Sequence, residues 1–421
     1  MFKKTTLAAS VLLAIAAQPV LATNGMAPTG LDPLQQSMGG ASAGYAANTM
    51  SMATNPAAAS FVEDGYDIGA EVFKPSRSAT FKGTAFGAPA DATADGNGDE
   101  LFLIPNAGYK RSLKGGLSVG ITAYGNGGMN TAYDGGVPFG TAYFSGTPGS
   151  TGIDLKQLFI APTASYKVNE NVAVGASLNM VYQRFEAEGL GAFSGFSSVP
   201  ANLTDKGGDS STGVGASVGI QGKVTDKLSA GLAYRSKTKM GKFEKYSGLF
   251  PNGGEFNVPA ATTLGIAYKA TPQTTVAADI EQIEYSKIAA MGNAPGTPLP
   301  FGSANGPGFG WDDQTVYKLG VKHQLNEGLA LMAGYNYGKS PISSDETTLN
   351  VLAPGITEKH ASLGFEKKLT PKSKLVGSYV HAFKKTVTGN ATVPPPGPLP
   401  LDAYDLKMDQ DIIGLGYSVE F

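Results

Sequence analysis

The sequence contains no cysteine, so the chain forms no disulfides and offers no thiolate nucleophile or metal ligand. Charged residues make up only 16% of its 421 residues, against about a quarter in typical soluble domains. The formal net charge of −2 gives no reason to expect a nucleic acid partner. The three histidines lie far apart, without a serine elbow, zinc-ligand spacing or phosphate loop, so we expect no catalytic residues, metal or cofactor.

Long apolar runs are also missing. Beyond residue 22, none approaches the roughly 18 residues of a membrane-spanning helix. The hydrophobic residues instead alternate with polar ones, as in "YDIGAEV" from Tyr66 to Val72 and "VAVGASLNMVY" from Val172 to Tyr182. A period of two indicates β-strands with one apolar face.

The first 22 residues have the pattern of a secretory signal peptide. Lys3 and Lys4 precede the apolar stretch "TTLAASVLLAIAA", and "VLA" ending at Ala22 provides small residues for cleavage. We therefore expect residues 1–22 to be removed during export. The mature chain would carry 30 basic and 34 acidic residues.

Alternation predicts fourteen strands in the remainder of the chain. They are expected to begin near residues 65, 101, 115, 154, 171, 211, 228, 255, 274, 314, 329, 359, 373 and 408. Short polar turns such as "KVNENV" and "KVTDKL" alternate strictly with long connections rich in Gly, Pro and Asp. An antiparallel meander places all short connections at one end and all long ones at the other.

Sorted connections on an even number of strands are typical of an outer-membrane barrel. The fold class is therefore all-β, a fourteen-stranded transmembrane antiparallel barrel over residues 62–421. A secreted β-sandwich or β-helix is the alternative, but such folds do not sort their loops by length in this way. The closing stretch "DIIGLGYSVEF" is then the last strand, with Tyr417 and Phe421 in an aromatic interface belt.

Residues 23–61 come before the first strand and show no sustained period of two. Small residues dominate in "MGGASAGYAANTMSMATNPAAASF". A barrel of fourteen strands is too wide to be filled by its own side chains, since about eight strands suffice for that. We therefore predict that residues 23–61 form a plug, or hatch, inside the bore.

The plug segment, with the triplet Asn55, Pro56 and Ala57 directly before strand one, resembles the FadL-type outer-membrane transporters of long-chain fatty acids and other hydrophobic compounds. The stretch "YKLGVKHQLNEGLALMAGYNYGKSPI" is similar to a late strand pair of the same family. The resemblance covers the whole mature chain. It implies a route in which ligand lands among the outer loops, passes a hatch that moves, and leaves sideways through a kink in the third strand.

The candidate kink lies at Gly125, Asn126, Gly127 and Gly128, because glycine within a strand often marks a bulge. The alternative is that the strand simply ends there. Alternate residues of each strand face the bore. The candidate ligand-binding residues among these inward-facing positions are Phe159, Arg235, Lys318 and Lys322. A cation among them could pair with a fatty carboxylate, or with an acid of the wall or plug.

The function that we expect is passive uptake of long-chain fatty acids or similar hydrophobic molecules into a Gram-negative outer membrane. Uptake of aromatic or alkane hydrocarbons is the nearest alternative. An outer-membrane adhesin or a lipid-acting enzyme would be a different class. Expected partners are the hydrophobic ligand, outer-membrane lipid with lipopolysaccharide, and the barrel assembly machinery, for a protein that is otherwise a monomer.

Overall fold

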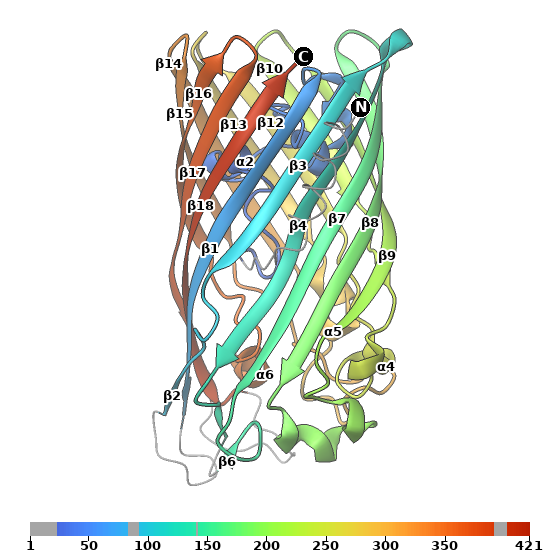
Figure 1. Ribbon diagram of the computed structural model, residues 1–421, viewed down its shortest axis with the longest axis vertical. Helices are drawn as coiled ribbons and strands as arrows, with labels where there is room; N and C mark the ends of the chain where they lie inside the picture. Colours follow the sequence, from blue (N-terminus) through green and yellow to red (C-terminus); the bar gives the residue numbers. More distant parts are fainter. Residues whose placement is uncertain (1–22, 83–91, 140–141, 391–401) are drawn as a thin grey trace, which may run out of the picture.

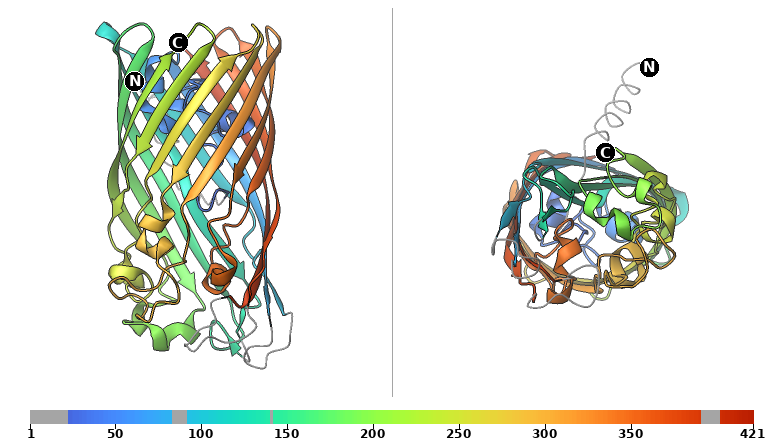
Figure 2. Two further views of the ribbon diagram at one scale, coloured as in Figure 1. Left: turned by 180° about the vertical axis from the view of Figure 1, so that it is seen from behind. Right: turned by 90° about the horizontal axis from the view of Figure 1, so that it is seen from below.

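The computed structural model describes residues 23–421 except 83–91, 140–141 and 391–401. Residues 1–22, the expected signal peptide, lie outside the described residues. One antiparallel sheet closes on itself as a barrel (Figures 1 and 2). The first strand pairs with the last along its whole length, so the described wall has no free edge between them.

Fourteen long strands make the wall in the described part of the chain, as the alternation predicted. They are β1 (Gly65–Phe81), β3 (Phe102–Ser112), β4 (Leu117–Tyr133), β7 (Thr151–Lys167), β8 (Val172–Glu188), β9 (Asp209–Lys223), β10 (Leu228–Arg235), β12 (Ala261–Lys269), β13 (Thr274–Ile283), β14 (Gln314–Asn326), β15 (Leu329–Gly338), β16 (Lys359–Thr370), β17 (Ser373–Val387) and β18 (Tyr404–Glu420). Short strands β2 (Thr93–Asp95) and β11 (Lys239–Met240) pair with β1 and β9, and β5 (Pro138–Phe139) pairs with β6 (Ala142–Tyr143).

Two expected strand starts lie four or more residues from the observed ones. The strand predicted near residue 408 begins at Tyr404, as β18. The strand predicted near residue 255 begins at Ala261, as β12. The preceding residues make only isolated bridges, such as Thr238 with Val258. Pro259 interrupts the stretch, because proline has no N–H to donate to a neighbouring strand.

The wall has an apolar outer face. Ile413 and Leu415 on β18 are 62% and 57% exposed, whereas Ile412, which faces the opposite side of the strand, is buried. The ring of Phe421 lies 6.1 Å from the ring of Tyr66 and 6.1 Å from that of Tyr109. The chain therefore ends in an aromatic group at the rim, beside the short turns.

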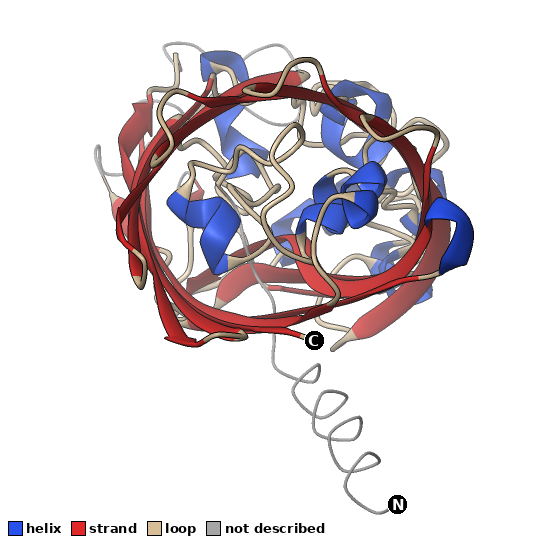
Figure 3. Ribbon diagram, turned by 90° about the horizontal axis from the view of Figure 1, so that it is seen from above, coloured by secondary structure: helices blue, strands red, loops and turns tan. Residues whose placement is uncertain are grey.

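Residues 23–61 lie inside the ring of strands, near the end with the short turns (Figures 1 and 3). They contain helices α2 (Pro33–Ser37), α3 (Ser51–Thr54) and the 3₁₀ helix η1 (Pro56–Ser60). Asp32 caps α2 by accepting a hydrogen bond from the Gln35 amide at 3.1 Å. Burial raises the pKa of the Asp32 carboxyl to about 6. The predicted plug is therefore present in the bore.

The connections at the opposite end are long and fold into short helices. They are η3 (Gly191–Phe196), η4 (Pro200–Asn202), η5 (Glu244–Tyr246), α4 (Pro251–Gly254), η6 (Tyr285–Lys287), α5 (Ala289–Gly292), η7 (Ser344–Glu346) and α6 (Thr347–Asn350). At the end with the short turns, η2 (Lys114–Gly116) is part of the turn between β3 and β4. None of the helices in the described ranges has the length and hydrophobicity to cross a membrane.

Candidate functional site

Five inward glycines let the backbone of the plug touch the wall. A Cβ added to any of them would come closer than 3.0 Å to plug backbone atoms. These glycines, here called the glycine belt, are Gly175, Gly231, Gly265, Gly320 and Gly334. They lie on β8, β10, β12, β14 and β15, so the plug is seated against backbone on several sides of the bore.

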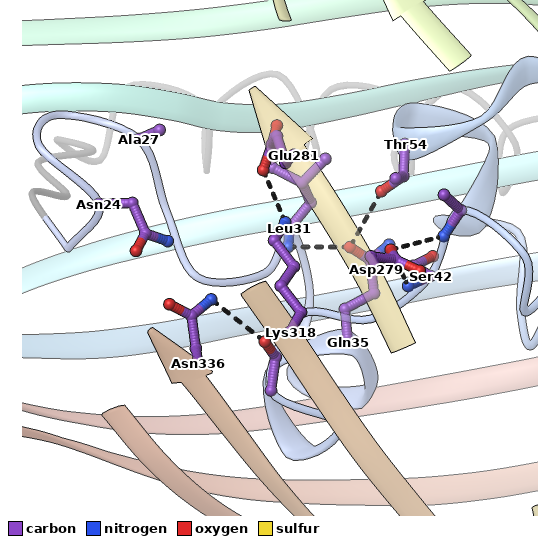
Figure 4. Close-up of polar contacts among 12 residues, drawn as sticks. Asn24, Ala27, Leu31, Gln35, Ser42, Thr54, Asp279, Glu281, Lys318 and Asn336 are labelled. Atoms are coloured by element: carbon purple, nitrogen blue, oxygen red, sulfur yellow. Dashed lines mark hydrogen bonds and ion pairs between the residues drawn. The ribbon is translucent and has the colours of Figure 1, made fainter. Parts of the chain in front are cut away.

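Polar groups lock the same contact. The Asp279 carboxylate on β13 accepts hydrogen bonds from the amides of Ser42 at 2.8 Å and Ala43 at 2.9 Å (Figure 4). On β1, Asp67 accepts from the amide of Thr49 at 2.8 Å. Because a carboxylate that receives backbone donors is favourably placed even when buried, these acids tie the plug to the wall.

The triplet that ends the plug is a structural junction. Asn55 caps η1 by accepting from the amide of Ala57 at 3.1 Å. Its side-chain amide donates to the carbonyls of Ala43 at 2.9 Å and Ile220 at 3.1 Å, which joins two parts of the plug to β9. Pro56 occupies the first position of η1 and faces Gly175. The three residues therefore join the plug to the wall.

Residues 23–31, here called the arm, extend from the plug toward the outer loops. The Tyr285 hydroxyl accepts from the amides of Met26 and Ala27, both at 3.2 Å, and donates to the Asn24 carbonyl at 2.6 Å. The Tyr285 ring packs edge-on against Trp311, with centroids 5.2 Å apart. One side chain of an outer loop therefore holds three backbone groups of the arm.

The candidate kink of the third strand is a β-bulge. Gly125 pairs with Leu158 and Gly127 pairs with Gln157, so Asn126 is an extra residue in β4. The strand continues to Tyr133 beyond it. The amide of Gly128 points to the Met26 carbonyl at 3.4 Å, which places the arm over the bulge.

Two of the predicted ligand-binding residues meet this bulge. Arg235, at the end of β10, donates to the side chain of Asn126. Its guanidinium lies 5.8 Å from the ring centroid of Phe159, and that ring stacks on Tyr124 at 5.5 Å. The structure thus brings Arg235, Phe159 and Asn126 together, although they come from three strands.

The two lysines are paired with acids of the wall. Lys318 lies 2.7 Å from Glu281, and both side chains are largely buried (Figure 4). Lys322 lies 2.9 Å from Glu366, at the level of the plug and away from Arg235. The alternative considered for these cations, pairing with wall acids, is what the structure contains.

A mixed cavity lies between the arm and the wall. It is bordered by Asn126, Arg235, Glu281 and Lys318, and by arm residues Ala27 to Leu31. Because the arm forms one side, movement of the arm would enlarge this cavity. The bulge of β4 borders the same space.

An apolar cavity lies among the outer loops. Its lining residues are Ile153, Phe185, Leu190, Phe193, Leu203, Leu249, Phe250, Ala290, Phe301, Pro307, Gly308, Phe309, Leu349 and Leu352. None of these side chains is polar. Such a space favours a hydrophobic ligand, because each methylene buried contributes about 0.8 kcal/mol.

The sequence did not reveal this outer cavity, because its residues come from loops without a periodic pattern. The sequence also did not predict the ion pair between Glu281 and Lys318, although it predicted that Lys318 faces the bore. The only available signal for the loops was their content of phenylalanine, which by itself does not distinguish a cavity from ordinary packing.

Glu346, in an outer loop, offers a pH response that the single tryptophan can report. Burial, together with Asp312 and Asp345, raises the pKa of the Glu346 carboxyl from 4.5 to about 7. The carboxylate lies against Gly310, next to Trp311. A raised carboxyl pKa means that the folded protein binds the proton more tightly than the unfolded chain does. The stabilisation is therefore complete below about pH 4.5 and is lost as pH rises through about 7.

We expect Trp311 emission to change with a midpoint near pH 7. Glu346→Gln should remove the transition, and Asp345→Asn should move its midpoint to lower pH, because one repelling carboxylate is gone. A fluorescence titration of the three proteins checks this. An unchanged transition in Glu346→Gln would exclude Glu346 as the titrating group.

With this geometry established, comparison with known proteins identifies the family. A family model described as outer membrane protein transport protein (OMPP1/FadL/TodX) matches residues 14–421. The chain belongs to this family. As an OMPP1/FadL/TodX protein it is a transporter of hydrophobic compounds in the outer membrane of a Gram-negative bacterium, in a family of transport channels rather than of enzymes.

Solved structures share the fold of this OMPP1/FadL/TodX protein. The toluene transporter TodX of P. putida has a TM-score of 0.68 and 20% identity, covering 93% of this chain and 99% of that chain. A Pseudomonas aeruginosa FadL homologue gives 0.68 and 14%, with coverage of 94% and 100%. The Ralstonia pickettii toluene transporter TbuX gives 0.64 and 18%, with coverage of 93% and 99%. The comparison with curated proteins found no match.

Proposed function

We propose that this protein takes up long-chain fatty acids or similarly hydrophobic molecules passively. The observation that carries the proposal is the outer cavity, whose described lining has no polar side chain. A hydrophobic molecule leaving the outer leaflet or the medium would be held there without contact with water. Passage through an open aqueous pore would forfeit about 0.8 kcal/mol for each methylene.

The proposed path continues past the arm. Movement of the arm away from Tyr285 would connect the outer cavity with the mixed cavity below it, beside the bulge at Asn126. Exit through the wall at Gly125–Gly128 would then deliver the molecule directly into the lipid. In this proposal residues 32–61 of the plug, held by the glycine belt, stay in place and keep the bore closed to the periplasm.

Neutral aromatic hydrocarbons are the second candidate substrate. Lys318 and Lys322 already have carboxylate partners, and Arg235 is held by Asn126 and by the Phe159 ring. Lys318 and Lys322 therefore have no unpaired charge to offer a fatty carboxylate, whereas Arg235 has only neutral partners in the described part of the chain, and its Nε makes no hydrogen bond. The solved relatives TodX and TbuX are named as toluene transporters, which supports the same alternative.

Uptake by cells lacking the gene tests both substrates. Deletion should reduce uptake of labelled oleate if fatty acids are carried, and of labelled toluene if aromatic hydrocarbons are carried. Reintroducing the gene should restore the lost uptake. Unchanged uptake of both compounds would reject the proposal and favour an adhesin or a lipid-acting enzyme.

Narrowing the outer cavity should slow uptake. Leu249 lines the cavity and is half-buried, so Leu249→Trp would add bulk inside the cavity without disturbing a strand. The indole would occupy space that a ligand entering here needs, and each ~1.4 kcal/mol that it adds to the barrier lowers the uptake rate about tenfold. Leu299→Trp, at a residue that is 44% exposed, is the matched control. Equal uptake by both variants would contradict entry through this cavity.

We also propose that the mature chain begins after residue 22, acts as a monomer without enzymatic activity, and contacts lipopolysaccharide at its outer rim. The closing aromatic residue Phe421 supports assembly by the barrel assembly machinery, because it lies at the rim beside Tyr66 and Tyr109.

A further inference from the structure

The outer wall changes abruptly from apolar to charged on one side of the barrel. On adjacent strands β16, β17, β18 and β1, the paired residues Leu363, Tyr379, Ile413 and Val72 are 43–62% exposed. Two residues further toward the outer loops, the paired residues on β17, β18 and β1 are His381, Asp411 and Lys74. Two residues advance a strand by only about 6.6 Å. On β18 and β1 the outer edge of the hydrocarbon layer therefore lies near this step, while on β17 the 45% exposed Phe383 extends the apolar surface two residues further.

Four exposed lysines lie at or just beyond this edge, and we call them the outer basic patch. They are Lys74, Lys359, Lys384 and Lys407, one on each of the four adjacent strands. The side chains of Lys74 and Lys384 have distant acid partners, Glu100 at 3.7 Å and Asp409 at 3.8 Å. Within the described ranges, Lys359 and Lys407 have no ion pair. The inward lysines of the same wall, in contrast, contact their acids at 2.7–2.9 Å.

On another side of the wall, the residues that follow the apolar partners are neutral. On β12, β13 and β14 the apolar partners Leu264, Ile280 and Tyr317 are followed by Thr262, Gln282 and Thr315. The hydroxyl of Thr315 donates to Gln282, so these groups satisfy one another. The change from apolar to charged residues is therefore absent on β12, β13 and β14.

We propose that the outer basic patch binds the phosphate groups of one lipopolysaccharide molecule in the outer leaflet. Phosphate forms strong charge-assisted hydrogen bonds with lysine, and basic residues at a membrane edge attract anionic headgroups. Strands lie about 4.8 Å apart and residues rise about 3.3 Å along a strand. Three strand spacings spread the cations over roughly 14 Å across the strands, and the offset of four residues between Lys407 and Asp411, the partner of Lys74, adds roughly 13 Å along them. That spread favours a headgroup with more than one phosphate over a phospholipid with a single phosphate. This site depends on the outer-membrane location and on the lipopolysaccharide contact proposed above, but not on the substrate.

The test measures lipopolysaccharide that remains bound to protein purified from outer membranes, by native mass spectrometry. The quadruple variant Lys74→Gln, Lys359→Gln, Lys384→Gln and Lys407→Gln should retain at least tenfold less lipopolysaccharide. Each lysine beside an anionic headgroup strengthens binding by about fivefold, so four fully engaged lysines would weaken binding by up to roughly 600-fold when removed. The corresponding four Lys→Arg substitutions preserve the charge and should retain the wild-type amount.

The matched control is Lys237→Gln with Lys239→Gln. These exposed lysines follow β10 and lie on the side of the ring opposite β18, seven strands away. The control should retain the wild-type amount. An unchanged quadruple variant, an equal loss in the control, or phospholipid as the lipid that the patch retains would overturn the proposal. Oleate and toluene uptake by the quadruple variant is measured separately, so a failure of the transport proposal would be distinguished from a failure of this one.

Discussion

Replacing Gly231 with alanine is expected to displace the plug and destabilise the barrel. The added Cβ would overlap the carbonyl oxygen of Ala43. The backbone fixes the position of both atoms, so no side-chain rotation can relieve the overlap. The same oxygen accepts from Asn55, and the Ala43 amide donates to Asp279, so a shift of this loop would break two further contacts. Forcing atoms into a packed interior costs about 1–3 kcal/mol, and the lost hydrogen bonds add to this cost.

Two measurements check this result. The midpoint of thermal unfolding in detergent should fall, and cells should become permeable to a large hydrophilic antibiotic that the seated plug excludes. Gly334→Ala should behave in the same way, because its Cβ would meet the amide of Gly39.

Gly416→Ala is the control for these variants. A Cβ at Gly416 would lie 3.6 Å from its nearest neighbour, Pro33, which is an ordinary contact. Stability and permeability should therefore stay at the wild-type level. If Gly231→Ala also left both unchanged, the glycine belt would not be what seats the plug.

Removing the charge of Lys318 is expected to be the most destabilising change to the ion pairs of the wall. Lys318→Met leaves the Glu281 carboxylate buried without its partner at 2.7 Å. Breaking one side of a buried pair typically costs about 3–5 kcal/mol, whereas replacing both members by apolar residues is often nearly neutral. The double variant Lys318→Met with Glu281→Leu should therefore recover most of the lost stability.

The ion pair of Lys374 is a control, because its distance equals that of the Lys318 pair but its side chains are more exposed. Its amino group lies 2.7 Å from Glu420, but the two side chains are 31% and 37% exposed. Exposed pairs contribute only about 0–1 kcal/mol, so Lys374→Met should have a small effect. Unfolding free energies of the four proteins in detergent or lipid decide the matter. Equal losses in Lys318→Met and Lys374→Met would refute the importance of burial.

The double variant also separates two roles of Lys318. If Lys318 only neutralises Glu281, the refolded double variant should take up oleate at the wild-type rate. A selective loss of oleate uptake, with toluene uptake preserved, would mean that Lys318 contacts the carboxylate of the ligand.

The fold could be predicted from the sequence because lipid imposes a strict rule on each strand. Outward residues such as Ile413 and Leu415 must be apolar, and a strand turns successive side chains to opposite faces. The start expected near residue 255 failed, since Phe256 and Val258 continue the apolar pattern in a loop. Alternation cannot tell a strand from an extended loop that happens to pack against other loops.

The site was only partly predictable. Inward parity correctly placed Phe159 and Lys318 on the buried face of the wall. It could not identify Glu281 as the partner of Lys318, because pairing depends on the register between β13 and β14, and a slip of one residue turns every side chain to the other face. Nor could it bring Arg235 to Asn126, which are 109 residues apart.

By itself, the sequence determined the barrel, the count of its strands, the plug and the membrane in which the protein resides, because these follow from hydrophobic period, loop length and chain order. The tertiary structure alone decided which cations have partners, where the plug touches bare backbone and which loop side chains enclose the apolar cavity. Those features depend on distances between residues remote in the chain, and such distances arise only when the sheet has closed and the loops have packed.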